Sequence, residues 1–312
     1  MEKECDVLCI GLIVANLLVK PVNKSVFDVD VTMVNEIDIL TGGDAMNEAA
    51  IFSKLGNRVG LVGKVGNDHF GKAILQLAQM DRVDIKNIKI DENVKTSVCI
   101  VLVNEKGDRN FLSYRGPNET LSVEDIDFSI IKKAKAVSIG SIFALPKLDR
   151  GGAELIFKEA RANNVITAFD VKYDTYKLGF DGIKGLLGYT DFFLPSYDEA
   201  VYLTKEKEPE KIADILLGYG AKTIVIKLGG EGCYIKSSKE SYLVEPYETE
   251  AIDTTGAGDN FVAGFLTGVL KGWDLMRCSK FANAVGSLSV KGIGATTFVK
   301  SMDQVIDYMN HF

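Results

Sequence analysis

The sequence predicts an α/β fold in which a mostly parallel sheet lies between two layers of helices, with a small β-sheet lid. Short continuous apolar runs recur along the chain, and such runs are typical of strands that are buried on both faces. Amphipathic helical patterns separate these runs, and this alternation favours a parallel sheet covered by helices. Two segments break the rhythm because apolar and polar residues alternate in them, and these segments predict the lid.

The elements follow in chain order. Buried strands are expected at residues 7–10, 136–139, 165–169, 192–194 and 223–226. Helices are expected at 46–55, 69–80, 151–163, 209–218, 258–271 and 275–290. Lid strands are expected at about 13–41 and 95–116, with a hairpin turn at 104–108. A β flap without a partner is the alternative for these segments. No repeat or long linker interrupts the chain, so residues 1–312 are interpreted as one domain that carries the lid.

The composition excludes several classes of protein. Hydrophobic residues make up 46% and charged residues 25%, which is ordinary for a globular chain. The net charge is −7 without a basic cluster, which argues against nucleic acid as a partner. The apolar run from Val7 to Val19 contains Asn16 and is too short to span a bilayer, and no signal peptide is indicated. Five scattered cysteines without a CxxC motif indicate reduced thiols and a cytoplasmic protein.

Two further patterns limit the chemistry. The only histidines are His69 and His311, so acid–base work is expected from carboxylates or lysines. Residues 66–73, GNDHFGKA, nearly match a phosphate-binding P-loop, but Ala73 replaces the hydroxyl residue that would bind Mg²⁺. A turn that caps the following helix is therefore the favoured interpretation.

Residues 253–264, DTTGAGDNFVAG, are the most informative segment. Small residues at a helix start leave backbone N–H groups accessible, and the helix dipole adds to their attraction for an anion. An acid beside that anion would repel it, unless the acid accepts a proton from a nucleophile that attacks the anion. The segment thus predicts phosphoryl transfer, with Asp259 as general base and the amides of Gly256, Ala257 and Gly258 as a phosphate cradle. A glycine-rich turn capped by Asp259 is the alternative.

A second segment carries a resemblance to a known family. In residues 42–66, the positions of Gly42, Gly43, Asn47, Ala49, Gly56 and Gly66 match the first signature of the ribokinase-like (PfkB) carbohydrate kinases. Residues 253–264 match the second signature of that family, in the order that the family requires. The chain therefore resembles this family over essentially its whole length. The resemblance implies a ribokinase-like α/β/α sandwich, a lid over the sugar that often serves as a dimer interface, and ATP-dependent phosphorylation of a hydroxyl group.

The resemblance also implies a nucleotide site. It places Lys227 and Gly258 near the phosphates, Gly229 and Gly232 near the nucleoside, and Asn283 beside the adenosine. It assigns Glu199 to hydrated Mg²⁺, while Ser196 stands where the family usually has an asparagine that contacts the nucleotide. Alternatives stay open: the 227–232 segment as a common turn, Glu199 as an exposed acid in a first helical turn, and Asn283 as a buried amide satisfied by local hydrogen bonds.

On the sugar side, the resemblance implies that Gly42, Gly43 and Asn47 contact the substrate together with Asp259. Asn16 replaces the family's sugar-binding aspartate, which predicts an altered preference for hydroxyl groups. Arg115 is similar to an arginine that faces the substrate in fructokinase-like members, and a surface arginine is its alternative. Asp253 and the carbonyl of Thr255 match a monovalent-cation site, which implies K⁺, although Phe298 replaces a serine that often adds a ligand there.

Three functional hypotheses remain. The first is an ATP- and Mg²⁺-dependent kinase that phosphorylates a primary hydroxyl of a small sugar. The second is a nucleoside kinase of the same fold, which Asn16 and the unusual Asp44-Ala45-Met46 keep open. The third is a catalytically silent protein that binds a sugar or a nucleotide, and Asp259 argues against it because such a protein has no need of a base.

Overall fold

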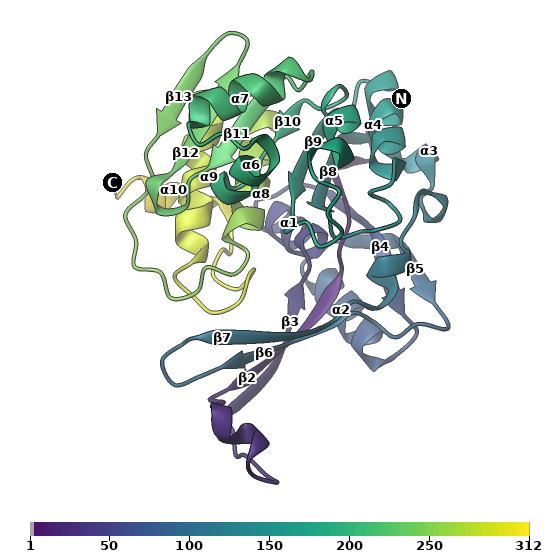
Figure 1. Cartoon of the computed structure of the whole chain (residues 1–312), viewed down its shortest axis with the longest axis vertical. Coiled ribbons are helices and arrows are strands. Elements are labelled where there is room, and N and C mark those ends of the chain that lie inside the picture. The colour runs from purple at the N-terminus through teal and green to yellow at the C-terminus, as the bar shows by residue number, and fades with distance from the viewer. Residues whose placement is uncertain (1–2, 312) are drawn as a thin grey trace.

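The computed structural model describes residues 3–311 and contains two β-sheets of different size. Figure 1 shows the large sheet with its helices as the body of the molecule, from which the small sheet projects. In the large sheet, β12 runs antiparallel to both of its neighbours, and all other neighbouring strands are parallel. Its strands are, in spatial order, β13 (Ser241–Val244), β12 (Cys233–Ser237), β11 (Thr223–Lys227), β10 (Phe192–Phe193), β9 (Ile166–Val171), β8 (Ala134–Ile142), β1 (Cys5–Ile10), β4 (Val59–Gly66) and β5 (Asp84–Asp91).

Helices cover both faces of this sheet, because successive strand residues point to opposite sides. In β1, Val7 and Cys9 join one apolar core, and Leu8 and Ile10 join the other. The first core includes residues of α1 (Asp44–Lys54), α2 (His69–Met80), α8 (Ala257–Leu270), α9 (Leu275–Ser289) and α10 (Met302–Met309). The second includes residues of α3 (Phe128–Ile131), α4 (Gly152–Ala162), α5 (Lys184–Leu187), α6 (Tyr197–Thr204) and α7 (Pro209–Gly218). The predicted α/β/α sandwich is thus present.

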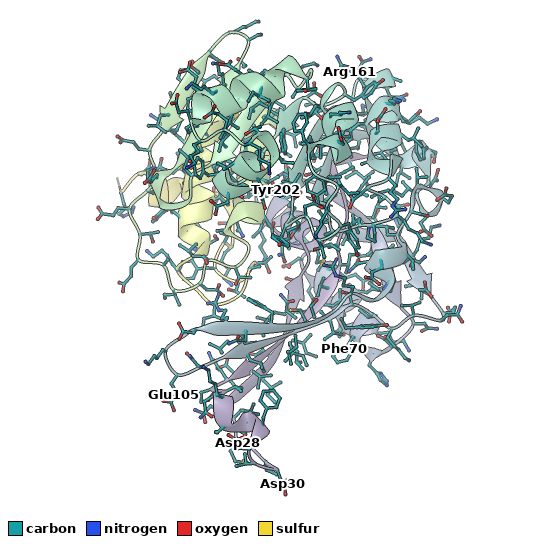
Figure 2. The ribbon with its side chains drawn as sticks, in the orientation of Figure 1. Asp28, Asp30, Phe70, Glu105, Arg161 and Tyr202 are labelled. Carbon is teal, nitrogen blue, oxygen red and sulfur yellow. The ribbon has the colours of Figure 1, made fainter. Side chains whose placement is uncertain are left out.

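The small sheet has four strands, in the order β3 (Glu36–Gly42), β2 (Val14–Lys20), β6 (Val98–Val103) and β7 (Arg109–Tyr114). These strands lie in the two segments where the sequence alternates. Figure 2 shows Asp28 and Asp30 at the far end of this sheet and Glu105 in the β6–β7 turn, well away from Arg161 on the body. We call this sheet the lid.

Within residues 3–311, every helix is too short or too polar to pass through a lipid bilayer. All five cysteines are free thiols.

Candidate functional site

The loop before α8 is held against a second loop by a glycine and an asparagine. Gly256 has a φ of 74°, and a Cβ added there would lie 2.4 Å from the Cβ of Ala295. Any side chain at this position would therefore clash as well as strain the backbone. The Nδ2 of Asn260 donates to the carbonyls of Gly256 at 2.8 Å and Ala295 at 2.7 Å. These contacts fix the backbone from which α8 begins.

The first turn of α8 leaves backbone donors accessible. The amide of Ala257 donates to the carbonyl of Thr254 at 3.2 Å, and that of Asn260 returns to Gly256 at 2.9 Å. The amides between them, of Gly258 and Asp259, have no backbone acceptor within residues 3–311. Unpaired amides at a helix start attract an anion. Of the three predicted cradle amides, that of Ala257 is thus engaged within the chain, while those of Gly256 and Gly258 have no backbone acceptor within residues 3–311.

Asp259 lies in the first turn of α8 with 9% of its surface exposed. Its Oδ2 accepts a hydrogen bond of 2.7 Å from the Nδ2 of Asn47 on α1. The pKa of Asp259 is raised to about 7, with burial as the main cause and the charge of Asp44 as the second, whereas Lys172 and the Asn47 amide act in the opposite direction. The cap of α8 is Gly256 without a side-chain hydrogen bond, so Asp259 does not serve as the N-cap. A carboxylate with this pKa suits a general base near neutral pH.

Two ion pairs lie close to Asp259: the pair of Lys227 with Asp170 is buried, whereas the Lys172 side chain of the second pair is 48% exposed. The Nζ of Lys227, at the end of β11, pairs with Asp170, near the end of β9. The Nζ of Lys172, just beyond β9, lies 3.0 Å from Asp44 at the start of α1. The Asp44 carboxylate raises the pKa of Lys172 more than burial lowers it. Burial lowers the pKa of Lys227, but Asp170 and its other acidic neighbours outweigh this effect, so the ammonium keeps its charge. These groups meet because parallel strands end at one edge of the sheet.

Beside the cradle lies a cavity of about 670 Å³. Of the predicted nucleotide residues, it is lined by Lys227, Gly229, Gly232, Gly258 and Asn283. A Cβ on Gly258 would lie 3.3 Å from the Nζ of Lys227, which places this ammonium directly at the helix start. A Cβ on Gly232 would lie 2.1 Å from the carbonyl of Val244, so only glycine fits this turn. The cavity has the size of a small-molecule site.

The amide of Asn283 is engaged within the protein. Its Nδ2 donates to the carbonyls of Val244 at 3.0 Å and Glu245 at 2.8 Å. Asn283 thus anchors the chain segment that follows β13 and forms one wall of the cavity. Local hydrogen bonds satisfy this donor, as the alternative interpretation of the residue expected.

Ser196 and Glu199 lie outside the residues that line the cavity and form a reciprocal cap at the start of α6. The amide of Ser196 donates to Glu199 Oε2 at 2.8 Å, and the amide of Glu199 donates to Ser196 Oγ at 3.4 Å. Glu199 still contributes its charge to Lys227 and Asp170. Among residues 3–311 no cluster of three metal-binding side chains is present. A single carboxylate fits Mg²⁺, because this ion keeps several waters and binds substrate phosphates.

The predicted sugar residues come together from α1, β2 and β3. The Nδ2 of Asn16 donates to the carbonyl of Thr41 at 3.3 Å, and a Cβ on Gly42 would lie 2.5 Å from the Asn16 amide group. Gly43 caps α1 with a φ of 86°, and a Cβ there would lie 2.4 Å from the carbonyl of Leu12. These glycines permit the close approach of α1, on which Asn47 reaches Asp259.

Arg115 lies at the end of the lid and contacts the loop that follows β9. Its guanidinium donates to Thr175 Oγ1 at 3.1 Å and to the Tyr176 hydroxyl at 3.4 Å. The structure therefore joins Arg115 to the same loop that carries Lys172.

A guanidinium occupies the position predicted for a monovalent cation. Arg109, at the start of β7, forms an ion pair with Asp253 and donates to Thr255 Oγ1 at 2.8 Å. The Asp253 carboxylate is thus already paired with a cation of the chain itself. Together with Phe298, which offers no oxygen ligand from its side chain, this arrangement does not fit K⁺.

Several residues of the site were missed by the sequence analysis. Gly286, Ser287 and Val290 line the cavity on the same side as Asn283. They follow Asn283 by three, four and seven residues, and this helical spacing could have identified them from the sequence. Asp170 and Lys172 directly follow a predicted buried strand, where ligand-binding residues of parallel sheets are found. The segment 245–251 gave no signal, because its place beside the cavity depends on the fold.

Comparison with known proteins gives the following similarities. The profile described as pfkB family carbohydrate kinase matches residues 5–302. Probable fructokinase-5 of Arabidopsis thaliana is 28% identical over 269 residues, which cover 81% of this chain and 83% of that protein. An Escherichia coli ribokinase II candidate, solved in complex with ATP and Mg²⁺, superposes with a TM-score of 0.86 at 24% identity and covers 98% and 99% of the two chains. An Arabidopsis thaliana ribokinase, solved with ribose and ATP, gives a TM-score of 0.82 at 22% identity and 99% coverage of both chains. The structural matches show a common fold.

Proposed function

This chain belongs to the pfkB family of carbohydrate kinases, and we propose that it transfers the γ-phosphate of ATP to a primary hydroxyl of a small sugar. The observation that supports this proposal most is the position of Asp259. Its buried carboxylate lies at a helix start with accessible amides, beside the Lys227 ammonium and a cavity of nucleotide size. On α1, Asn47 holds the carboxylate from the side where the sugar-binding residues meet.

In the proposed reaction, the phosphates of ATP lie between Lys227 and the amides of the first turn of α8. Asp259 accepts the proton of the acceptor hydroxyl while the oxygen of that hydroxyl forms a bond to the γ-phosphorus. At the same time, the bond from the γ-phosphorus to the bridging oxygen of ADP breaks. Lys227 and the amides balance negative charge on the transferred group and on ADP. Mg²⁺, held through water near Glu199, would neutralise phosphate charge. Positioning and electrostatics therefore supply most of the rate enhancement.

The polar atoms near Asp259 favour a polyhydroxylated acceptor. Asp44 Oδ2 and Asn47 Oδ1 are buried and have no hydrogen-bond partner within residues 3–311. Both atoms accept hydrogen bonds, and buried acceptors are ordinarily satisfied. Hydroxyl groups are donors that match them, and the Lys172 ammonium beside Asp44 can in turn donate to a hydroxyl or carbonyl oxygen. We therefore include Asp44 and Lys172 among the acceptor-binding residues, with Asn16, Gly42 and Gly43.

A substrate screen tests this proposal. ADP release is measured with Mg²⁺-ATP and a panel of aldoses, ketoses, sugar acids and nucleosides. A sugar that gives turnover, with transfer to a primary hydroxyl shown by phosphorus NMR, is the expected result. Turnover with nucleosides alone would show that the acceptor is a nucleoside and not a sugar. Calorimetric binding of sugars without ADP release across the panel would favour the catalytically silent alternative.

We also propose that the protein forms a homodimer through the lid and acts in the cytoplasm, where its free thiols stay reduced. Strand register places Ile39, Leu17, Ile100 and Leu112 in one row on a single face of the lid. Ile39 and Leu112 are 41% and 53% exposed, and Ile37 and Tyr114 extend the same face. Asn16 points to the opposite face, because it neighbours Leu17 in the strand. A contiguous apolar face of this kind marks a protein interface.

A further inference from the structure

The contact between Arg109 and Asp253 joins the lid to the loop that precedes α8. Arg109 follows the β6–β7 turn, and the two residues are separated by 144 positions in the sequence. The Arg109 side chain is 16% exposed and that of Asp253 is 4% exposed. Figure 1 shows the hairpin that contains β7 extending toward the C-terminal part of the body. The guanidinium also donates to Thr255 Oγ1 at 2.8 Å and to the carbonyl of Ile252 at 3.5 Å.

Asp253 connects the two loops that shape the cradle. Its Oδ1 accepts from the amide of Thr255 at 2.7 Å, and its Oδ2 accepts from the amide of Gly294 at 2.8 Å. Gly256, which caps α8, packs against Ala295, the neighbour of Gly294. The Asp253 carboxylate therefore holds together the backbone that positions the accessible amides.

A cation beside a carboxylate with this burial offsets the cost of removing its charge from water. Arg109 supplies this charge from the chain itself. Its guanidinium lies on Oδ1, while backbone amides are bonded to both carboxylate oxygens. A soluble cation on Asp253 would meet the positive charge of the guanidinium at short range. The Thr255 hydroxyl, another oxygen at this place, is already an acceptor for Arg109.

We propose that Arg109 is a tethered cation that replaces a monovalent metal ion beside Asp253, so that the protein needs no K⁺ to order its phosphate cradle. Arg109 touches neither the acceptor residues nor the nucleotide cavity, and it acts as a positioning residue through Asp253. The part of this inference that concerns turnover rests on the proposed kinase function. The part that concerns cation binding stands independently of it.

The test replaces Arg109 by glutamine and uses Lys106→Gln as the matched control. Lys106 is exposed in the same hairpin turn, so its replacement removes the same charge without touching Asp253. Thermal denaturation is followed in KCl and in tetramethylammonium chloride at equal ionic strength. Wild type and K106Q are expected to have the same Tm in both salts. R109Q is expected to have a lower Tm that K⁺ specifically raises. A K⁺-specific rise in Tm of the wild type, or none in R109Q, would overturn the inference.

Turnover gives a second readout. Wild-type kcat/KM is expected to be the same with and without K⁺. In R109Q, loosening of the cradle is expected to lower kcat/KM by about 10²-fold, with partial recovery in K⁺. Arg109→Lys keeps the charge and is expected to retain activity without K⁺, and it replaces R109Q in both assays if that variant does not fold. In that case, K⁺ activation of R109K would contradict the proposal. If no acceptor is found for the wild type, the kinase proposal fails while the denaturation assay still decides the cation inference.

Discussion

Replacement of Asp259 by asparagine separates the chemical role of this residue from its structural role. The side chains have the same shape, and the oxygen of the new amide can still accept the 2.7 Å hydrogen bond from Asn47. The substitution removes the negative charge and with it the capacity to accept a proton from the acceptor hydroxyl. We expect kcat to fall by about 10²–10⁴-fold, the usual contribution of a general base. The KM for ATP is expected to change little, because the cradle amides and the cavity stay intact.

The same substitution is expected to stabilise the folded protein above neutral pH. Burial raises the pKa of Asp259 from 3.8 to about 7, so the folded state binds a proton between these pH values that the unfolded chain has released. Stability contributed by this proton is complete below about pH 4 and is lost as the pH rises through about 7. A rise in pKa of this size corresponds to about 4 kcal/mol, taken at about 1.4 kcal/mol per pH unit. D259N carries no titratable group at this position, so above neutral pH its free energy of unfolding should exceed that of the wild type by up to about this amount.

Asp149→Asn is the matched control for these experiments. Burial also raises the pKa of Asp149 to about 7, and its Oδ2 accepts from the amide of Leu145 away from the cradle. Urea denaturation at pH 5 and pH 8 is expected to show a smaller pH dependence for both variants than for the wild type. Only D259N is expected to lose turnover. In the wild type, kcat/KM for the acceptor should rise with pH through about 7, as Asp259 loses its proton. Near-wild-type turnover in D259N, or an equal loss in D149N, would refute the assignment of the base.

Three further predictions concern the residues around this base. Lys227→Met removes the cation beside the buried Asp170, whose pKa is already raised to about 8 by burial, so Asp170 should take up a proton in this variant near neutral pH. Urea denaturation should therefore show a loss that grows from pH 7 to above pH 8, toward about 3–5 kcal/mol for a broken buried ion pair, and unchanged stability would argue against the pair. Asp44→Asn removes a charge that raises the pKa of Asp259, so the acid limb of the pH–rate profile should move to lower pH. The substitution also removes a charged hydrogen-bond acceptor, so kcat/KM for the acceptor should fall by about tenfold or more. An unmoved limb with unchanged kcat/KM would exclude Asp44 from the site. In analytical ultracentrifugation, the Leu112→Asp variant should be monomeric. The control variant Phe111→Asp should stay dimeric, because Phe111 has a similar exposure but lies on the opposite face of the lid. Equal behaviour of the two variants would contradict the proposed interface.

Local patterns were sufficient for much of the fold. The helix expected at 69–80 coincides with α2, and those expected at 209–218 and 275–290 match α7 and α9 within one residue. Apolar runs located the central strands because both of their faces are buried. Strands β4 and β5 were not predicted. Glycine-rich sequence in β4 and frequent charged residues in β5 hide the apolar pattern on which the prediction depends.

The two signature segments carried the family assignment, which the profile match over residues 5–302 confirms. A backbone that approaches a ligand closely tolerates only glycine or other small residues, so such positions are visible in the sequence without any knowledge of the fold. Asp259 was visible as a candidate base because the glycines that mark the helix start lie directly beside it in the chain.

Contacts between distant segments could not be derived in this way. The bond from Asn47 to Asp259 spans 212 positions, and the pair of Arg109 with Asp253 spans 144. The sequence therefore determined the fold class, the glycine-lined helix start and the acid within it, since each depends on residues a few positions apart. Only the tertiary structure decided which cation accompanies Asp253 and which charges raise the pKa of Asp259. Electrostatic interactions depend on distance in space and on burial, and both are set by how the sheet brings the ends of its strands together.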